Sequence, residues 1–312
     1  MIAAPGQLSA AEINSMLHSM GQTPRLDMYA IGHVRSNGLA MFFEKCLNEL
    51  SQPHNLLSVE RPPHGSIEPF LTRPQFGGAY INPPLAVEAA PYLPTLTEAA
   101  SAIGQVDTIA VRSNKSGRTL VADNVTWKGI RATLTKDFVP SAYEGQAALI
   151  VGNSDAAAAS AIYALQSLCV QEIHTIGFRA RDCNHLQSMT DLQRIPEPFV
   201  IISALPAEKS IVVSPVLKLL SHTSTPNSTK PPSPAPSASL GPGRSGSKVF
   251  VDLANGVKGR GDSVSLAGEL GWNSYGVVDV NAWTIVETLR LLVGENVPWD
   301  FVRLAGGRGL YT

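Results

Sequence analysis

The fold is decided by the stretch Phe76-Gly77-Gly78-Ala79-Tyr80-Ile81-Asn82-Pro83-Pro84-Leu85-Ala86 and by two stretches downstream of it. The second runs from Leu96 to Ile109 and the third from Ala122 to Ile130. We expect β-strands within or beside them, since three short runs are of β type. These runs are Ala79–Asn82, Thr108–Val111 and Thr119–Ala122. The segment Thr126–Thr133 is typical of a helix that connects this region to the next.

A second unit begins at Ala147-Ala148-Leu149-Ile150-Val151-Gly152, an apolar run of the kind found in buried strands. An alanine-rich helix is predicted at Ala156–Cys169. Further strands are expected at His174–Gly177, Phe199–Ala204 and Val249–Leu253, separated by segments long enough for crossover helices. This alternation of strands and helices predicts a doubly wound parallel sheet.

The remaining segments frame these two units. Residues 8–20 are expected to form a helix, because Ser9 and Glu12 have the spacing of a capping box. Strands are predicted at Leu26–Gly32 and His54–Val59. Apolar residues at helical spacing predict helices at Leu39–Leu50 and Trp283–Val293. Residues 222–247 are rich in serine and proline and have little to bury, so we expect a disordered loop there.

Composition excludes several classes of protein. With 312 residues, 44% hydrophobic and 16% charged, the chain is long enough for two domains with substantial cores. Its net charge is -1, and the basic residues are scattered apart from the weak run Lys258-Gly259-Arg260, which disfavours direct binding to nucleic acid. Three cysteines without C-x-x-C spacing supply neither a disulfide framework nor a metal site. The start of the chain is not typical of a signal peptide, and no apolar run is long enough for a membrane span. We therefore expect an intracellular protein of the cytoplasm or nucleus.

The three ordered stretches resemble the signatures of the shikimate dehydrogenase family. Phe76–Ala86 resembles G-G-x-x-V-T-x-P-x-K, and Leu96–Ile109 resembles L-T-E-A…A-I-G-A-V-N-T-I. Ala122–Ile130 resembles G-D-N-T-D-W-x-G-I. The resemblance implies an α/β fold with two domains.

The resemblance also implies where these domains lie. A substrate-binding-like domain is expected at residues 26–125 plus 283–312, with the C-terminal helix packing back on it. A degenerate Rossmann-like domain is expected at 126–282. Residues 1–25 resemble a linker and the end of a preceding dehydroquinase-like domain.

The departures from the family concern its chemistry. The lysine and aspartate that the family uses as acid/base partners are replaced here by Ala86 and Thr126, neither of which exchanges a proton readily near neutral pH. A substrate-contacting asparagine is replaced by Asp107, whose charge would repel a carboxylate ligand. The resemblance leaves four candidates for vestigial ligand binding, which are Ser36, Asn82, Asp107 and Asn124.

The nucleotide loop departs in the same way. A dinucleotide site needs glycines that let backbone N–H groups approach a pyrophosphate at a helix start. Here the loop is Gly152-Asn153-Ser154-Asp155, in which only the first family glycine remains. Arg179 is a weak match to the arginine that reads the 2′-phosphate of NADP in the family. We therefore expect no cofactor and no metal.

Loss of chemistry on a retained fold predicts a pseudoenzyme. The pattern resembles the terminal domain of fungal quinate-pathway repressors, which implies that the partner is a transcriptional activator and that a quinate- or shikimate-type metabolite is sensed. The alternatives are a divergent NADP-dependent shikimate or quinate oxidoreductase and a purely structural domain. Ala86 and Thr126 favour the regulatory interpretation over the enzymatic one.

Overall fold

The computed structural model divides into two compact units, which are described separately. One comprises Met1–Val125 with Thr284–Thr312, and the other comprises Thr126–Trp283. The residues that the structure describes are 26–32, 47, 54–60, 66–93, 95–114, 117–153, 155–222, 248–254 and 262–293. The helix predicted at 8–20, most of that at 39–50 and nearly all of the loop at 222–247 lie outside them.

The first unit is built on a five-stranded mixed sheet in the order β2-β1-β3-β4-β5. Strand β1 pairs in parallel with β2 and β3, whereas β3–β4 and β4–β5 are antiparallel. The strands are β1 (Leu26–Gly32), β2 (His54–Val59), β3 (Phe76–Ala86), β4 (Gln105–Asn114) and β5 (Gly117–Asp123). The helices are α3 (Glu68–Leu71), the 3-10 turn η2 (Val87–Ala89) and α4 (Glu98–Ile103). The three predicted β runs in this region are therefore the middles of longer strands.

Helix α4 has clear sequence signals at both ends. The Thr97 side chain accepts a hydrogen bond from Ala100 N at its start, and Gly104 ends it with φ 75°. One face of the sheet and α4 share a buried cluster that includes Phe76, Ile109 and Ala100. This packing places the start of β4 and the end of β5 beside α4.

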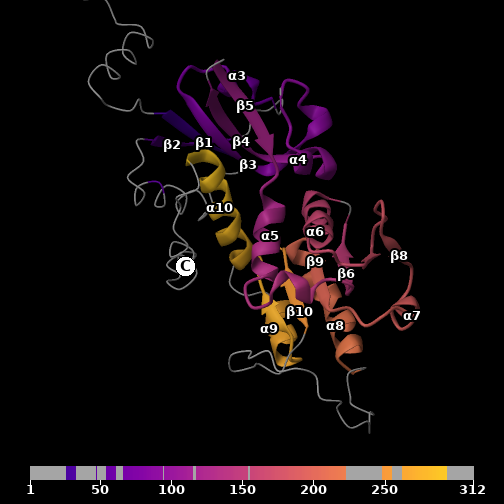
Figure 1. Ribbon diagram of the computed structural model, residues 1–312. Coiled ribbons are helices and arrows are strands. Elements are labelled where there is room, and N and C mark those ends of the chain that lie inside the picture. Colours follow the sequence, from indigo (N-terminus) through magenta and orange to yellow (C-terminus); the bar gives the residue numbers. More distant parts are fainter. Residues whose placement is uncertain are drawn as a thin grey trace, which may run out of the picture. The chain divides into compact units, whose positions relative to one another are not determined.

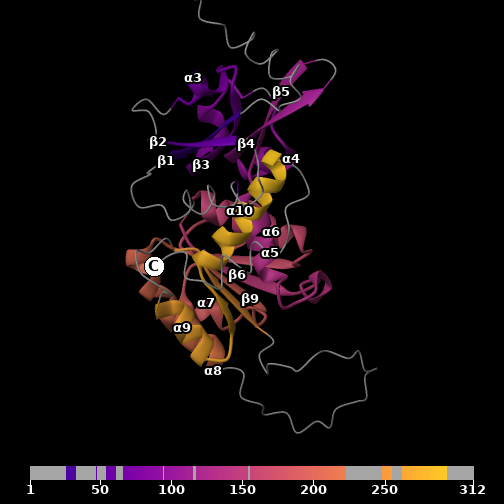
Figure 2. The same ribbon diagram turned by 90° about the vertical axis from the view of Figure 1, so that its left-hand side faces the viewer.

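The C-terminal helix α10 (Val277–Val293) covers the other face of this sheet (Figures 1 and 2). Ile285, Leu289 and Leu292 of α10 share a buried cluster with Met28 and other residues of the sheet. The prediction that the C-terminal helix packs back on the first domain is thus confirmed.

The second unit is a six-stranded parallel sheet in the order β11-β10-β9-β6-β7-β8. Its strands are β6 (Ala147–Gly152), β7 (Glu172–Ile176), β8 (Asn184–Leu186), β9 (Val200–Ala204), β10 (Val249–Asp252) and β11 (Asn273–Tyr275). Its helices are α5 (Thr126–Leu134), α6 (Ala156–Ser167), α7 (Met189–Leu192), α8 (Val213–His222) and α9 (Asp262–Glu269), with 3-10 turns η3 (Pro140–Ala142) and η4 (Ala207–Val212). The predicted parallel, doubly wound sheet is confirmed.

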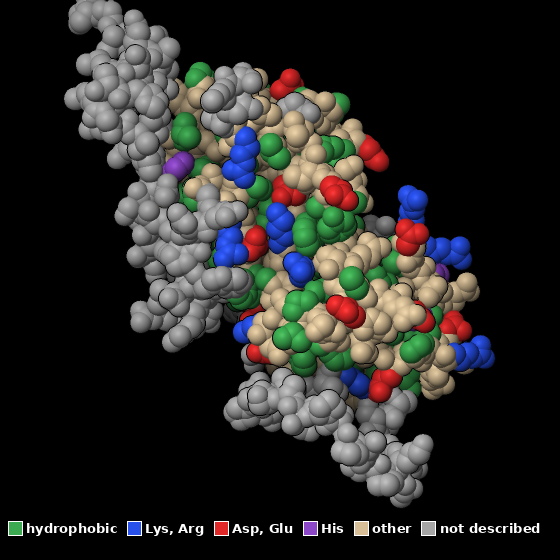
Figure 3. Space-filling model, viewed as in Figure 1, with side chains coloured by type: hydrophobic (Ala, Val, Ile, Leu, Met, Phe, Trp, Pro, Cys, Tyr) green, Lys and Arg blue, Asp and Glu red, His purple; other side chains and the backbone are tan. Residues whose placement is uncertain are grey.

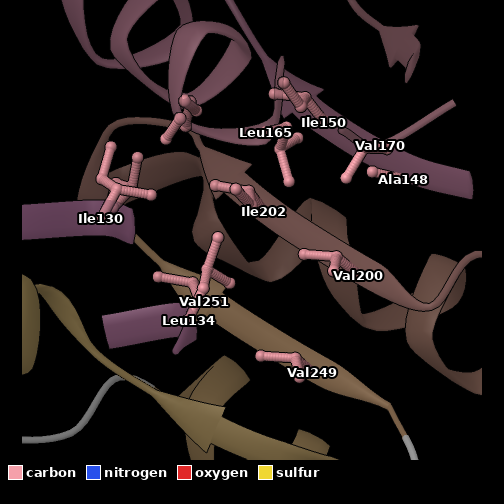
Figure 4. Close-up of a cluster of buried hydrophobic side chains, with 14 of the residues drawn as sticks. Ile130, Leu134, Ala148, Ile150, Leu165, Val170, Val200, Ile202, Val249 and Val251 are labelled. Atoms are coloured by element: carbon pink, nitrogen blue, oxygen red, sulfur yellow. The ribbon is translucent and has the colours of Figure 1, made fainter. Parts of the chain in front are cut away.

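Both faces of this sheet are buried, which explains why its central strands are almost wholly apolar. Alternate residues such as Ala148, Ile150, Ile202 and Val251 pack with α5 and α6 (Figure 4). The intervening residues, such as Leu149 and Phe250, pack with α8 and α9. The strand order reverses beside β6, between β7 on one side and β9 on the other.

Two strands and two helix ends are among the features that differ from the sequence predictions. Strands β8 and β11 were not predicted, because each spans only three residues and lies at an edge of the sheet. Helix α6 ends at Ser167 rather than Cys169, which has φ 57°. Helix α10 begins at Val277 rather than Trp283, and the Asp279 carboxylate accepts a hydrogen bond from Gly276 N at 3.1 Å there.

No helix among the described residues is long and apolar enough to cross a membrane. On the face shown in Figure 3, acidic and basic side chains are interspersed.

Candidate functional site

A cluster of buried polar side chains lies where β4 begins and β5 ends. Thr108 and Asp123 are register partners on these antiparallel strands, and Asp107 and Asn124 adjoin them in sequence. All four side chains are buried, with exposed fractions of 3% or less. Their location corresponds to the polar positions of the second and third signature stretches.

Asp107 is engaged with the backbone of its own unit. Its Oδ1 atom accepts hydrogen bonds from Val125 N at 2.7 Å and from Thr108 Oγ1 at 2.9 Å. Val125 immediately precedes α5. The carboxylate therefore fixes the segment that leads into this helix, a role that the family asparagine does not imply.

Asp123 and Asn124 complete the network. Asp123 Oδ1 accepts hydrogen bonds from Thr97 Oγ1 at 2.5 Å and from Asn124 N at 2.9 Å. Asn124 Nδ2 donates to Gln105 O at 3.3 Å. Sequence reasoning did not select Thr97 or Asp123, although both lie within the quoted signature stretches.

The remaining predicted substrate-side residues have side chains that do not titrate near neutral pH. Ala86 ends β3, and Asn82 lies within the same strand; both are half-buried. Thr126 is the first residue of α5 and is also half-buried. Ser36 lies outside the described residues. Ala86 and Thr126 still offer no group that titrates near neutral pH.

The second unit places the degenerate nucleotide loop between β6 and α6. Gly152 ends β6, and a Cβ there would lie 2.8 Å from the backbone oxygen of Ala204 on β9. The surviving glycine is therefore required by the close approach of two strands, whether or not a phosphate binds. Ser154 lies outside the described residues.

Asp155 occupies the start of α6. It is the N-cap residue, and its Oδ1 atom accepts a hydrogen bond from Ala158 N at 2.9 Å. A dinucleotide fold normally presents these first N–H groups and the positive end of the helix dipole to a phosphate. Here the protein supplies its own anion at that position.

Two further polar residues lie at the carboxyl ends of neighbouring strands. Ser203 of β9 is the register partner of both Val151 and Asp252. The buried Asp252 carboxylate accepts hydrogen bonds from Ala254 N at 3.0 Å and from Ser263 Oγ of α9. The weakly predicted Arg179 is exposed and lies shortly after β7. The described residues contain no group of His, Cys, Asp and Glu that could hold a metal ion.

Comparison with known proteins identifies the origin of this arrangement. The chain is 30% identical over 219 residues to the pentafunctional AROM polypeptide of Candida glabrata, which covers 68% of this chain and 13% of that protein. It is 32% identical over 212 residues to the pentafunctional AROM polypeptide of Saccharomyces cerevisiae, covering 67% and 13% respectively. It thus spans about an eighth of the length of these relatives. No family model matches the chain.

Solved structures agree with the sequence relationship. The dehydroquinate dehydratase and shikimate dehydrogenase structure from S. pombe AroM covers 98% of this chain and 57% of its own, with a TM-score of 0.71 and 19% identity. The shikimate dehydrogenase of Aquifex aeolicus covers 91% and 98%, with a TM-score of 0.64 and 16% identity. This chain has the shikimate dehydrogenase fold. The fold is present, while Ala86, Thr126 and the loop that follows Gly152 differ from the signatures that the sequence resembles.

Proposed function

We propose that this chain is a catalytically silent shikimate dehydrogenase-like domain that regulates transcription through contact with a protein partner. The observation that carries the proposal is the Asp155 carboxylate, which lies at the start of α6 and bonds to Ala158 N. A pyrophosphate at this helix start would have to displace it and would meet its negative charge. Hydride transfer to NADP requires that pyrophosphate to be held.

The substrate side supports the same proposal. Ala86 and Thr126 replace the two groups that the family resemblance assigns to proton transfer, and one such group typically contributes 10²–10⁴-fold to a rate. Asp107 is bonded to Val125 N and Thr108, so its carboxylate serves the packing of its own unit. Three independent requirements of the reaction are therefore weakened together.

The specific role follows from the family resemblance. The fungal quinate-pathway repressor resembles a copy of AROM sequence that has lost its catalytic residues. The resemblance of this chain to that repressor implies that its partner is a transcriptional activator. In this proposal a quinate- or shikimate-type metabolite binds at most as a signal, by favouring one conformation of the domain. Direct binding to promoter DNA is not part of the proposal, since the net charge is -1.

The first experiment measures NADPH formation by the purified chain with shikimate or quinate. The unmutated chain is expected to match the enzyme-free blank. The double variant Ala86→Lys with Thr126→Asp is also expected to stay at the blank, because the loop at Asp155 is unchanged. Steady-state turnover by the unmutated chain would establish the alternative, a divergent NADP-dependent oxidoreductase.

The second experiment tests the partner. The chain is used to capture the quinate-pathway activator, with and without quinate or shikimate, beside a mobility-shift assay on promoter DNA. Capture of the activator at moderate salt supports the proposal. Salt-resistant DNA binding without capture would overturn it.

A further inference from the structure

Two arginines of the first unit lie together beside the turn between α3 and β3. Arg118, near the start of β5, donates from Nη1 to the backbone oxygens of Arg73 at 3.1 Å and Pro74 at 3.2 Å, and from Nη2 to that of Phe76. Arg73 donates from Nη1 to Tyr29 Oη at 3.2 Å. The Arg118 guanidinium is therefore held by the backbone of the segment that contains Arg73, whereas the Arg73 guanidinium is held by Tyr29.

Aromatic rings hold both groups in place. The Arg73 guanidinium lies 5.0 Å from the ring centroid of Phe70 and 5.8 Å from that of Tyr29. The Arg118 guanidinium lies 5.8 Å from the ring centroid of Phe76. A guanidinium held against rings and carbonyls loses little further freedom when it binds an anion.

Neither charge is balanced by an acid in the part of the chain that the structure describes. Other arginines there form ion pairs, as Arg290 does with Glu287 at 2.6 Å and Arg181 with Asp182 at 3.6 Å. No carboxylate lies within ion-pair distance of Arg73 or Arg118 among the described residues. Burial lowers the pKa of Arg118.

We propose that the surface formed by Arg73 and Arg118 docks an acidic peptide segment of a protein partner. Arg73 is exposed, and among the described residues its side chain donates a hydrogen bond only to Tyr29, so it can bind a carboxylate with two parallel hydrogen bonds. Arg118 spends three donors on carbonyls and contributes mainly its charge. Two cations at one turn suit an acidic peptide better than a nucleic-acid backbone, whose binding draws on many phosphate contacts.

This inference supplies a partner chemistry for the regulatory role proposed above and rests on that role. The two can fail separately, because peptide binding is measured without any dehydrogenase assay. If the chain oxidises shikimate or quinate and also binds the peptide, the proposed function is refuted and the docking surface is not. A silent chain that does not bind the peptide would refute the docking surface alone.

The test uses the full chain and a fluorescently labelled hexaglutamate peptide as the probe, followed by fluorescence anisotropy. Arg73→Gln removes the charge and keeps a polar side chain, and it is expected to weaken binding about fivefold, as loss of an exposed charge pair does. Arg181→Gln removes the same charge from an exposed arginine of the second unit and should change nothing. Arg73→Lys should restore only part of the affinity. Thermal unfolding of each variant shows whether its fold is intact.

Equal weakening by Arg73→Gln and Arg181→Gln would show general charge attraction and overturn the proposal, as would no binding by the unmutated chain. A single-stranded oligonucleotide serves as the second probe. If Arg73→Gln weakens binding of the oligonucleotide but not binding of the peptide, the surface binds nucleic acid and the proposal is wrong.

Discussion

The Oδ1 atom of Asp155 lies 2.9 Å from the backbone nitrogen of Ala158 and caps helix α6. This one contact stabilises the helix start at which a dinucleotide fold normally holds a phosphate. A serine, threonine, aspartate or asparagine at an N-cap satisfies a helix donor that otherwise has no partner. In this chain the donor belongs to the helix start that a dinucleotide would use.

We predict that Asp155→Ala lowers the free energy of unfolding by about 1 kcal/mol, the usual effect of losing an N-cap. Asp155→Asn is the matched control and should be nearly neutral, because asparagine caps equally well. Urea denaturation measures both.

Isothermal calorimetry of the unmutated chain should show NADP binding weaker than about 1 mM, near −4 kcal/mol. Saturable micromolar binding would mean that the loop holds phosphate in another geometry.

Asp107 provides a second prediction. Asp107→Ala removes the acceptor of the Val125 N–H and the Thr108 hydroxyl, and we expect it to destabilise the fold by about 2–3 kcal/mol. Asp107→Asn keeps an oxygen at the same position and should cost clearly less. The comparison is made by urea denaturation. Equal stability of Asp107→Ala and the unmutated chain would contradict a structural role for this carboxylate.

Gly78 tests the packing of α10 on the first sheet. Its φ is 152°, and a Cβ there would lie 2.5 Å from Leu292 Cδ2 of α10 and 3.0 Å from the backbone oxygen of Ile109. Gly78→Ala should therefore destabilise the protein by about 3 kcal/mol, from backbone strain and overpacking together. Gly104→Ala is the control, because its φ is 75° but no atom lies near the added Cβ, so only about 1 kcal/mol is expected. Similar effects of the two variants would argue against the close contact with α10.

From the environment of Tyr275 we predict that the stability of the fold decreases at alkaline pH. Its hydroxyl donates to Asp137, and burial together with that carboxylate raises its pKa far above the usual value. A raised pKa means that the stabilisation is complete below the unfolded-state pKa of about 10 and is lost as the pH rises above it. The unmutated chain should thus lose stability above about pH 10. Tyr275→Phe should be about 1 kcal/mol less stable at neutral pH and should lose less on alkalisation.

Denaturation series at neutral and alkaline pH measure this difference. Burial also raises the pKa of Tyr143, so the variant Tyr143→Phe serves as a comparison and should reduce the alkaline loss independently. Parallel alkaline curves for Tyr275→Phe and the unmutated chain would show that the Asp137 contact does not control the titration.

The two ends of the Ser/Pro-rich segment are held together by described residues. Lys248 Nζ donates to Leu220 O at 3.4 Å and bonds to Glu197, and Trp272 Nε1 donates to Ser221 Oγ at 3.0 Å. We predict that replacing residues 224–246 by a short Gly/Ser linker changes Tm by no more than about 2 °C, because loop length has a small effect when the ends are fixed. Lys248→Met in the full chain should lower Tm more than the excision does. A large fall in Tm on excision would show that the segment contributes to the stability of the fold.

Most of the main elements and their order follow from local patterns in the chain. Strands such as Ala147–Gly152 were predictable with their correct bounds, since a strand buried on both faces is continuously apolar. The start of α5 at Thr126 was predicted in the same way from a local pattern. The replaced family positions Ala86 and Thr126 could be read in the same way, because a missing titratable group is a property of the residue itself.

The hydrogen-bond partners of the buried polar groups, by contrast, depend on how distant parts of the chain pack together. That Asp107 bonds to Val125 and that Asp123 bonds to Thr97 depends on the pairing of β4 with β5 and on the placement of α4, which residues distant in sequence create together. The short strands β8 and β11 exist because an adjacent strand supplies their hydrogen bonds, which no local propensity reports. The partner of a buried polar side chain depends on packing between residues that are distant in sequence, so it cannot be predicted from periodicity along the chain.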